Sequence, residues 1–195
     1  MNAVRSATVE ERGELVDTLT AAFATDPVVT WLLGGPGRTN ERRLRRFFRL
    51  TVPRSAAGLG GCDLADDGAA VWYAPGAYAS ASGSLGELAR AVATFGRGLG
   101  QAGEADAEMR RLHPTEPHWY LQFVGVRPGH VGRGTGTALL EHRLATIDAA
   151  GGPAYLESSL ERNLPLYERL GFVVREEVRL GPGAPPEWLM WRAAR

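Results

Sequence analysis

The stretch Val126-Arg-Pro-Gly-His-Val-Gly-Arg-Gly-Thr-Gly-Thr-Ala-Leu-Leu140 decides the fold. It follows a strand-like run and leads into a helical pattern, and it places Gly132, Gly134 and Gly136 between the two. Glycines allow tight turns, so successive backbone N–H groups converge on an anion at the positive end of a helix dipole. The stretch therefore predicts a site for a ligand that carries a pyrophosphate.

Two common nucleotide-binding loops do not fit this stretch. A Walker A loop needs Gly-Lys-Ser/Thr, and the chain contains no lysine. The dinucleotide fingerprint G-x-G-x-x-G needs a glycine at position 137, where Thr137 stands. These departures disfavour a nucleotide-dependent enzyme. On this motif alone, a plain strand-to-helix turn remains an alternative.

A second motif follows about thirty residues later, Asn163-Leu-Pro-Leu-Tyr-Glu-Arg-Leu-Gly-Phe172. Together the two motifs resemble the signatures of the GNAT superfamily, the acetyl-CoA-dependent N-acetyltransferases, whose loop reads Gln/Arg-x-x-Gly-x-Gly/Ala. Val131 stands at the Gln/Arg position. The resemblance implies that acetyl-CoA binds to the backbone donors of the loop.

Within this family the chain most resembles the puromycin N-acetyltransferases and their actinobacterial relatives. The resemblance implies a small-molecule primary amine as acceptor, with a puromycin-like amine as the leading candidate, and a role in antibiotic resistance. The segments that carry it are residues 21–27, 66–72, 116–121, 155–158 and 188–191.

The resemblance also implies which residues bind coenzyme A. The N–H of Val124 is expected to bind the thioester carbonyl, and Gly125 and Val126 to pair with the pantetheine amides. Asn163 precedes Leu-Pro, so it is expected to cap a short helix as well as contact the coenzyme. The full expected set is Val124, Gly125, Val126, Val131, Gly132, Arg133, Gly134, Thr135, Gly136, Thr137, Asn163 and Tyr167.

Acetyl transfer needs a neutral amine and a proton for the departing thiolate. Tyr167 is the candidate general acid, because a phenol stays protonated at neutral pH. Glu157, in a largely apolar strand, is the candidate base, acting through water, or an anchor for the substrate ammonium; a salt bridge to an arginine is the structural alternative. Cys62 has no histidine at recognisable spacing, which favours direct attack in a ternary complex over an acetyl-cysteine.

The acceptor pocket is expected to have aromatic walls. The acidic residues show no obvious cluster in the sequence, which favours a small amphipathic amine over a polycationic acceptor. Two alternatives remain, a non-catalytic acetyl-CoA-binding sensor or scaffold and a protein or peptide N-acetyltransferase. The expected substrate-binding residues are Trp31, Trp72, Tyr73, Tyr120, Gln122 and Glu157.

Composition narrows the partners. Lys+Arg and Asp+Glu are both 22, so no net field recruits nucleic acid or a membrane surface. The four histidines lack metal-ligand spacing, so no metal is expected beside acetyl-CoA. The N-terminal residues lack an apolar signal core, which predicts a cytoplasmic protein, as a monomer or homodimer.

The hydrophobic pattern predicts one mixed α/β (α+β) domain over residues 1–195 with a single central sheet. The family resemblance implies that this sheet is mixed, mostly antiparallel and splayed, with helices on both faces. In the strand at 118–126, alternation places Trp119, Leu121 and Phe123 on one face and His118, Tyr120 and Gln122 on the other. The expected helices cover 9–24, 40–51, 84–111 with a break near 96–103, about 135–151 and about 163–170, and the other strands cover 61–65, 69–74, 154–158, 172–178 and 188–191.

Overall fold

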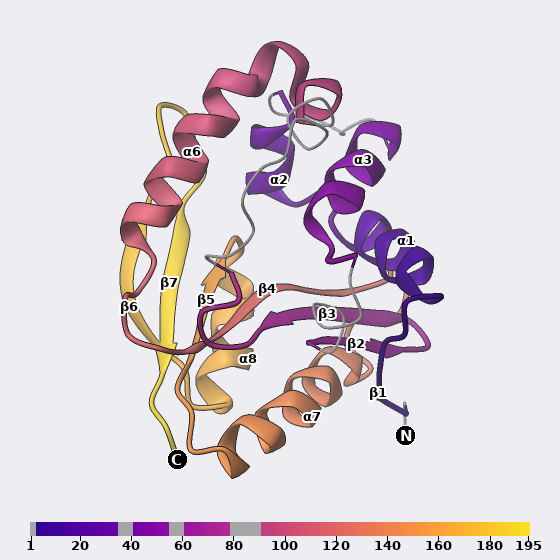
Figure 1. Ribbon diagram of the computed structural model, residues 1–195, viewed down its shortest axis with the longest axis vertical. Coiled ribbons are helices and arrows are strands. Elements are labelled where there is room, and N and C mark those ends of the chain that lie inside the picture. Colours follow the sequence, from indigo (N-terminus) through magenta and orange to yellow (C-terminus); the bar gives the residue numbers. More distant parts are fainter. Residues whose placement is uncertain (1–2, 35–40, 55–60, 79–90) are drawn as a thin grey trace.

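A single twisted sheet organises the molecule (Figure 1). The computed structural model describes residues 3–34, 41–54, 61–78 and 91–195. The strands lie in the order β1-β2-β3-β4-β5-β7-β6, and every pair is antiparallel except β4 and β5. This confirms the predicted mixed sheet. The strands are β1 (Arg5–Ser6), β2 (Cys62–Ala65), β3 (Gly68–Tyr73), β4 (Trp119–Val126), β5 (Ala154–Ser158), β6 (Val173–Val178) and β7 (Glu187–Arg192).

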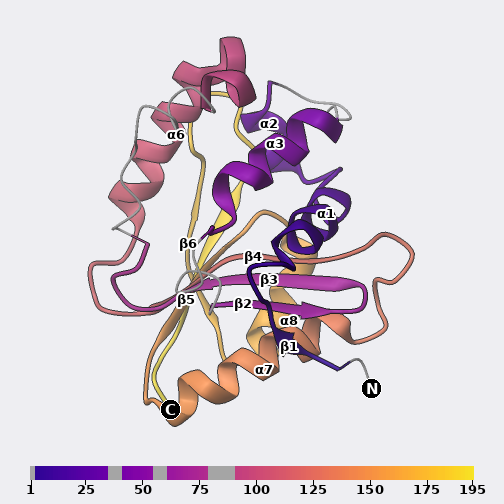
Figure 2. The same cartoon turned by 45° about the vertical axis from the view of Figure 1, so that its right-hand side comes forward.

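Helices cover both faces of the sheet. Figure 2 shows α1 and α3 above strands β2 to β4 and α7 below them. Phe47 and Phe48 of α3 pack with α1 in one core cluster, and Leu140 and Ile147 of α7 pack in the other. The helical elements are α1 (Arg12–Ala22), α2 (Pro27–Leu32), α3 (Glu41–Thr51), η1 (Gly96–Gly98), α6 (Leu99–Leu112), α7 (Thr135–Ala149), η2 (Glu161–Asn163) and α8 (Leu164–Arg169).

The sequence analysis missed α2. Asp26 and Pro27 end the first helix as expected, but they also start the next one. The Asp26 carboxylate accepts hydrogen bonds from the N–H groups of Val28 and Val29, and Pro27 occupies the first turn. The predicted break at 96–103 is shorter than expected, because α6 already begins at Leu99. Residues 84–90 of that predicted helix lie outside the described residues.

The predicted alternation in β4 is wrong at Phe123. Val71 of β3 pairs with Phe123 and Trp72 pairs with Leu121, so Gln122 is an extra residue on β4, a β-bulge. Leu121 therefore packs toward α7, whereas Phe123 packs against the aromatic rings of α3 on the opposite face. The bulge exchanges the faces that β4 presents from Phe123 onward.

Strands β4 and β5 separate directly beyond the bulge. Their parallel register contains Trp119↔Ala154, Tyr120↔Tyr155 and Leu121↔Leu156 and then ends. From Gln122 to Val126, the edge of β4 that faces β5 has no strand partner within the described part of the chain. This separation confirms the predicted splay and leaves backbone N–H and C=O groups at the edge of a gap.

Candidate active site

The gap between β4 and β5 is a cleft of about 480 Å³, which we call the coenzyme cleft. One wall is the splayed part of β4, and another is the short helix α8. The loop before α7 closes it, and Gly136 and Thr137 belong to the first turn of that helix, where N–H groups have no intrahelical partner. The sequence-predicted residues that line the cleft are Val124, Gly125, Val126, Val131, Gly132, Gly134, Thr135, Gly136, Thr137, Asn163 and Tyr167.

The loop adopts its shape through two glycines in the left-handed region. Gly132 has φ of 84° and Gly134 has φ of 86°, and Gly134 is also the residue from which α7 starts, without a side-chain cap. An added Cβ would be strained at either position, so the loop requires glycine there. Arg133 differs from the expectation: it is exposed and is not among the residues that line the cleft.

Asn163 lines the cleft but does not cap α8. Its backbone is helical, with φ of −89° and ψ of −16°, and its side chain makes no capping hydrogen bond. The reason is that η2 leads directly into α8, so Asn163 lies inside a continuous helical turn. The predicted capping role was therefore wrong, and only its position beside the cleft agrees with the expectation.

Tyr167 lies on α8 at the cleft and is 6% exposed. Burial, with a smaller contribution from the negative charge of Asp26, raises the pKa of its hydroxyl well above the usual range. The phenol is therefore protonated at every physiological pH. Its ring packs against Phe172, with 6.2 Å between ring centroids, which fixes its direction.

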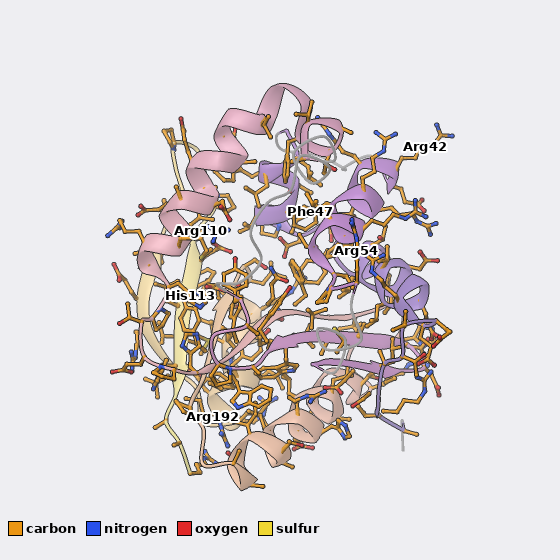
Figure 3. The ribbon with its side chains drawn as sticks, viewed as in Figure 1. Arg42, Phe47, Arg54, Arg110, His113 and Arg192 are labelled. Atoms are coloured by element: carbon orange, nitrogen blue, oxygen red, sulfur yellow. The ribbon has the colours of Figure 1, made fainter. Side chains whose placement is uncertain are left out.

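A second, larger cavity of about 780 Å³ lies on the other side of the splay, and we call it the acceptor cavity. Helices α2, α3 and α6 surround it, with β4, β5 and β7 at its base. Its lining is mainly apolar. Figure 3 shows Phe47 reaching from α3 toward this space, whereas Arg42 points away from it.

The two cavities meet. Gln122 on the bulge of β4 and Glu157 at the end of β5 line both of them, so one set of side chains faces the coenzyme cleft and the acceptor cavity. The side chain of Glu157 is 5% exposed. The complete shared set is Phe23, Asp26, Gln122, Phe123, Glu157 and Ser159.

Buried carboxylates gather at this junction, contrary to the expectation that the acidic residues form no cluster. Asp26 lies at the N-terminus of α2, and its carboxylate accepts a 2.5 Å hydrogen bond from Ser159. Glu157 and Glu187 lie on adjacent strands and, because Leu189 pairs with Glu157, on the same face of the sheet. The sequence did not indicate the cluster, because 131 positions separate Asp26 from Glu157.

Burial dominates the electrostatics of this cluster. Desolvation raises the pKa of Glu187 to about 8, and the negative charges of Glu157 and Asp26 add to the effect. Desolvation also raises the pKa of Asp26, although the hydrogen bonds from Ser159, Val29 and Val28 oppose it. Asp106 also lines the acceptor cavity but forms a salt bridge with Arg110. The cluster would accept a bound cation readily.

The expected aromatic walls are only partly present. Tyr120 and Gln122 line the acceptor cavity as predicted. Trp72 is fully buried beneath α7, Trp31 packs in a separate cluster between α2 and α6, and Tyr73 stacks behind Tyr120; none of these three is among the residues that line either cavity. The rings that line the acceptor cavity instead are Phe23, Phe47, Tyr78, Phe95, Tyr120 and Phe123.

The described residues contain neither a membrane-spanning helix nor a group of metal ligands. None of their helices is long and apolar enough to cross a bilayer. They contain no group of three or more His, Cys, Asp or Glu side chains that could hold a metal ion.

Comparison with known proteins agrees with this geometry. Residues 91–174 match the model of the acetyltransferase (GNAT) domain. A solved structure from Corynebacterium glutamicum, described as histone acetyltransferase HPA2 and related acetyltransferase, is 30% identical, with a TM-score of 0.77 over 100% of this chain and 98% of that one. The chain belongs to the GNAT family of acetyltransferases. GNAT acetyltransferases use acetyl-CoA, and the coenzyme cleft is formed by the family's motif residues.

Two further GNAT relatives extend the comparison. The polyamine N-acetyltransferase of Drosophila melanogaster shares the fold, with a TM-score of 0.65 and 18% identity over 99% of this chain and 100% of that chain. A segment of 62 residues is 42% identical to an uncharacterised N-acetyltransferase of Schizosaccharomyces pombe. That segment covers 32% of this chain and 25% of the yeast protein, so the match extends over only a quarter of the yeast protein's length.

Proposed function

We propose that this protein transfers the acetyl group of acetyl-CoA to the primary amine of a small molecule, by direct attack in a ternary complex. The observation that carries the proposal is the junction of the two cavities at Gln122 and Glu157. A thioester in the coenzyme cleft and an amine in the acceptor cavity would meet there, as direct transfer requires. A coenzyme-binding scaffold would not need the second cavity.

In the proposed complex the backbone of β4 binds the coenzyme. The unpaired edge from Gln122 to Val126 supplies N–H and C=O groups for the pantetheine amides, and the N–H of Val124 binds the thioester carbonyl. The first turn of α7, at Gly136 and Thr137, faces the pyrophosphate. A backbone donor at the carbonyl would stabilise the negative charge that develops on its oxygen during attack.

Two side chains carry the proton transfers. Glu157 removes a proton from the bound ammonium, and the neutral amine then attacks the thioester carbonyl. Tyr167 donates its proton to the departing thiolate of coenzyme A, since burial keeps that phenol protonated. Cys62 is buried, and burial raises the pKa of its thiol to about 12, which agrees with a route that forms no acetyl-cysteine.

The acceptor that best fits the cavity is a small cationic amine with an apolar body. The walls are mostly apolar, and one oxygen of Glu157 and one of Glu187 have no hydrogen-bond partner among the described residues. A bound cation would satisfy such oxygens and would favour the ionised form of Glu187. Puromycin-like aminonucleosides stay the first candidates, with antibiotic resistance as the corresponding role. The peptide acceptor alternative predicts activity on cationic peptides instead.

A thiol-release screen tests the proposal. Purified protein with saturating acetyl-CoA would be offered aminonucleosides, arylalkylamines, diamines, amino acids, aminoglycosides and peptides. We expect release only with small amines and a new amide by mass spectrometry. Release with peptides alone would overturn the acceptor class. Tight acetyl-CoA binding without release from any acceptor would favour the sensor or scaffold.

A further inference from the structure

His113 lies next to Glu157 on the side away from the acceptor cavity, and His118 lies next to His113. His113 Nδ1 lies 3.8 Å from Glu157 Oε1, and His113 Nε2 lies 3.1 Å from His118 Nε2. His118 Nδ1 in turn lies 2.6 Å from the carbonyl oxygen of Glu116. Figure 3 shows His113 beyond Arg110, where α6 ends. Neither histidine lines either cavity, so neither would touch the amine or the coenzyme.

Local structure fixes the positions of both rings. Pro114 follows His113 and disfavours helical backbone at that residue, which ends α6 and turns His113 into an extended conformation with ψ of 131°. The N–H of His113 still bonds to the carbonyl of Met109. His118 comes directly before β4 and is 7% exposed, whereas the side chain of His113 is 16% exposed.

The hydrogen-bond partners determine the tautomers. His118 Nδ1 faces a carbonyl oxygen, so it must carry a hydrogen and donate it. In neutral His118 the Nε2 atom is then an acceptor, and His113 Nε2 must donate to it. His113 Nδ1 is left as an acceptor that faces Glu157 Oε1, and both atoms are buried with no hydrogen-bond partner among the described residues.

One additional proton between these two atoms would satisfy both acceptors once the side chains close from 3.8 Å to hydrogen-bond distance. When Glu157 holds the extra proton, its carboxyl group donates toward His113. When His113 holds it, the imidazolium donates toward both Glu157 and His118. When His118 holds it, His118 Nε2 donates to His113 Nε2 instead of accepting from it. These three states differ only by the proton's movement along one line of atoms, and each keeps the contact with the Glu116 carbonyl. Glu157 without that proton is a base with an unsatisfied oxygen.

We propose that His113 and His118 form a proton relay. The relay removes the proton that Glu157 has taken from the acceptor amine and so restores Glu157 as a base. The inference rests on the proposed acetyl transfer. The ammonium gives one proton to Glu157 and becomes the attacking amine; Glu157 passes that proton to His113, and from there it reaches His118 or solvent. After attack, the amine's second proton replaces the one that Tyr167 gives to the departing thiolate, so the phenol is regenerated and each turnover releases one proton through the relay. His113 and His118 are positioning residues that act through Glu157.

The groups around His113 favour passing the proton on over keeping it on the ring. The ring is enclosed by Tyr78, Tyr120 and Tyr155, with centroids 4.8 to 5.2 Å away. Burial raises the pKa of Tyr78 to about 12 and also raises the pKa values of Tyr120 and Tyr155, so these phenols stay neutral and do not compete for the proton. The charged groups that face the pair are Glu157 from β5 and Glu116 before β4. Burial also lowers the pKa of His118, so this ring stays neutral at rest and releases a proton that it receives rather than holding it.

The pH dependence of His113→Gln tests the relay. With a small amine that the parent acetylates, we expect kcat/KM about tenfold lower near pH 7 and within about twofold of the parent near pH 10, where solvent already deprotonates the amine. In His113→Ala, added imidazole should restore part of the loss near pH 7. The matched control is His142→Gln on α7, 41% exposed at its side chain and away from both cavities.

A loss that is equal at every pH, with no rescue by imidazole, would mean that His113 only supports the fold and would overturn the relay. Unchanged kinetics would overturn it as well. If the parent acetylates no amine, the proposed function fails separately, and nitrogen NMR of the imidazoles then decides the relay. Neutral His113 protonated at Nε2, beside His118 protonated at Nδ1, supports it; His113 protonated at Nδ1 alone beside a neutral His118 contradicts it.

Discussion

The coenzyme cleft and the acceptor cavity share a boundary, but backbone atoms form much of the first and side chains form the second. Backbone forms much of the cleft, along β4 and the loop before α7, and nearly half of its lining residues come from the single stretch 121–137. Side chains form the acceptor cavity, and they come from helices and strands between Phe23 and Glu187. A site made of backbone is recognisable from glycine spacing, whereas a site made of side chains depends on the whole fold.

The largest expected effect falls on the cleft. Gly136→Val should weaken acetyl-CoA binding about 100-fold, because a β-branched side chain would stand beside Val126, at the place that we propose for the pyrophosphate. A Cβ at Gly136 has an ordinary 3.7 Å contact and no unusual φ, so the fold should persist. Calorimetric titration measures the affinity. Gly100→Val on α6, where a Cβ meets nothing within 4 Å, is the control, and equal affinities in the two variants would contradict the site.

Tyr167→Phe should affect the chemistry and leave both binding sites intact. Loss of the proton donor should lower kcat about 100-fold, within the usual range for a positioned acid. Acetyl-CoA affinity should change less than threefold, because the ring and its contact with Phe172 remain. Steady-state kinetics at saturating acetyl-CoA give kcat, and titration gives the affinity. A normal kcat would show that water protonates the thiolate.

Glu187→Gln should affect the acceptor cavity and leave the coenzyme cleft unchanged. We expect KM for a cationic amine to rise about tenfold at pH 8.5, where Glu187 is mostly ionised, with acetyl-CoA affinity unchanged. At pH 6 the parent Glu187 is protonated, so the difference should shrink. Glu177→Gln, on the exposed part of β6, is the matched control. An equal KM for parent and Glu187→Gln at pH 8.5 would exclude Glu187 from amine binding.

The same variant should change the pH dependence of stability. Folded Glu187 keeps its proton up to about pH 8, whereas the unfolded chain releases it near 4.5, so rising pH across this window favours the unfolded state. Each pH unit in the window should cost the parent at most about 1.4 kcal/mol, a cost that Glu187→Gln avoids. Urea unfolding at pH 5, 6.5 and 8 measures it. A constant difference between the two proteins would show that Glu187 does not titrate in this way.

Arg133→Ala should have the smallest effect. Its side chain is exposed and does not line the cleft, so acetyl-CoA affinity should fall no more than about threefold, the size of a weak exposed charge contact. Titrations at low and high salt measure the change. A loss as large as that of Gly136→Val would show that side chains contribute to the cleft as much as the backbone.

The sequence predicted most of the fold because its signals are local. The glycine loop, the Asp66-Asp67-Gly68 turn and the apolar faces of the helices each depend on a few neighbouring residues, and α3 was predicted to within one residue at its start. The position of Phe123 could not be predicted, because the bulge is defined by β3, fifty residues earlier. Residue type alone did not distinguish a core aromatic such as Trp72 from one that lines a cavity.

The candidate site divides in the same way. Tyr167 was predicted from a motif that the family resemblance made specific, whereas Glu157 was predicted from the cost of burying a carboxylate in a largely apolar strand. Asp26 was missed as a site residue because Asp-Pro indicates a helix boundary, and it also serves that purpose in the structure. Glu187 carries no local signal at all, and its raised pKa arises only from burial beside Glu157 and Asp26.

The position of β7 has a consequence for the order of assembly. It is the last strand in the chain, yet it lies between β5 and β6 and hydrogen-bonds with both. During synthesis, strands β1 to β5 can pair as they leave the ribosome, because β5 pairs with β4, but β6 has only β7 as a strand partner within the described residues and must wait for residues 187–192. Glu187 arrives with that strand, so the acidic wall forms only when the sheet is finished. A nascent chain that ends before β7 would already contain every residue that lines the coenzyme cleft, whereas its acceptor cavity would lack the wall that contains Glu187.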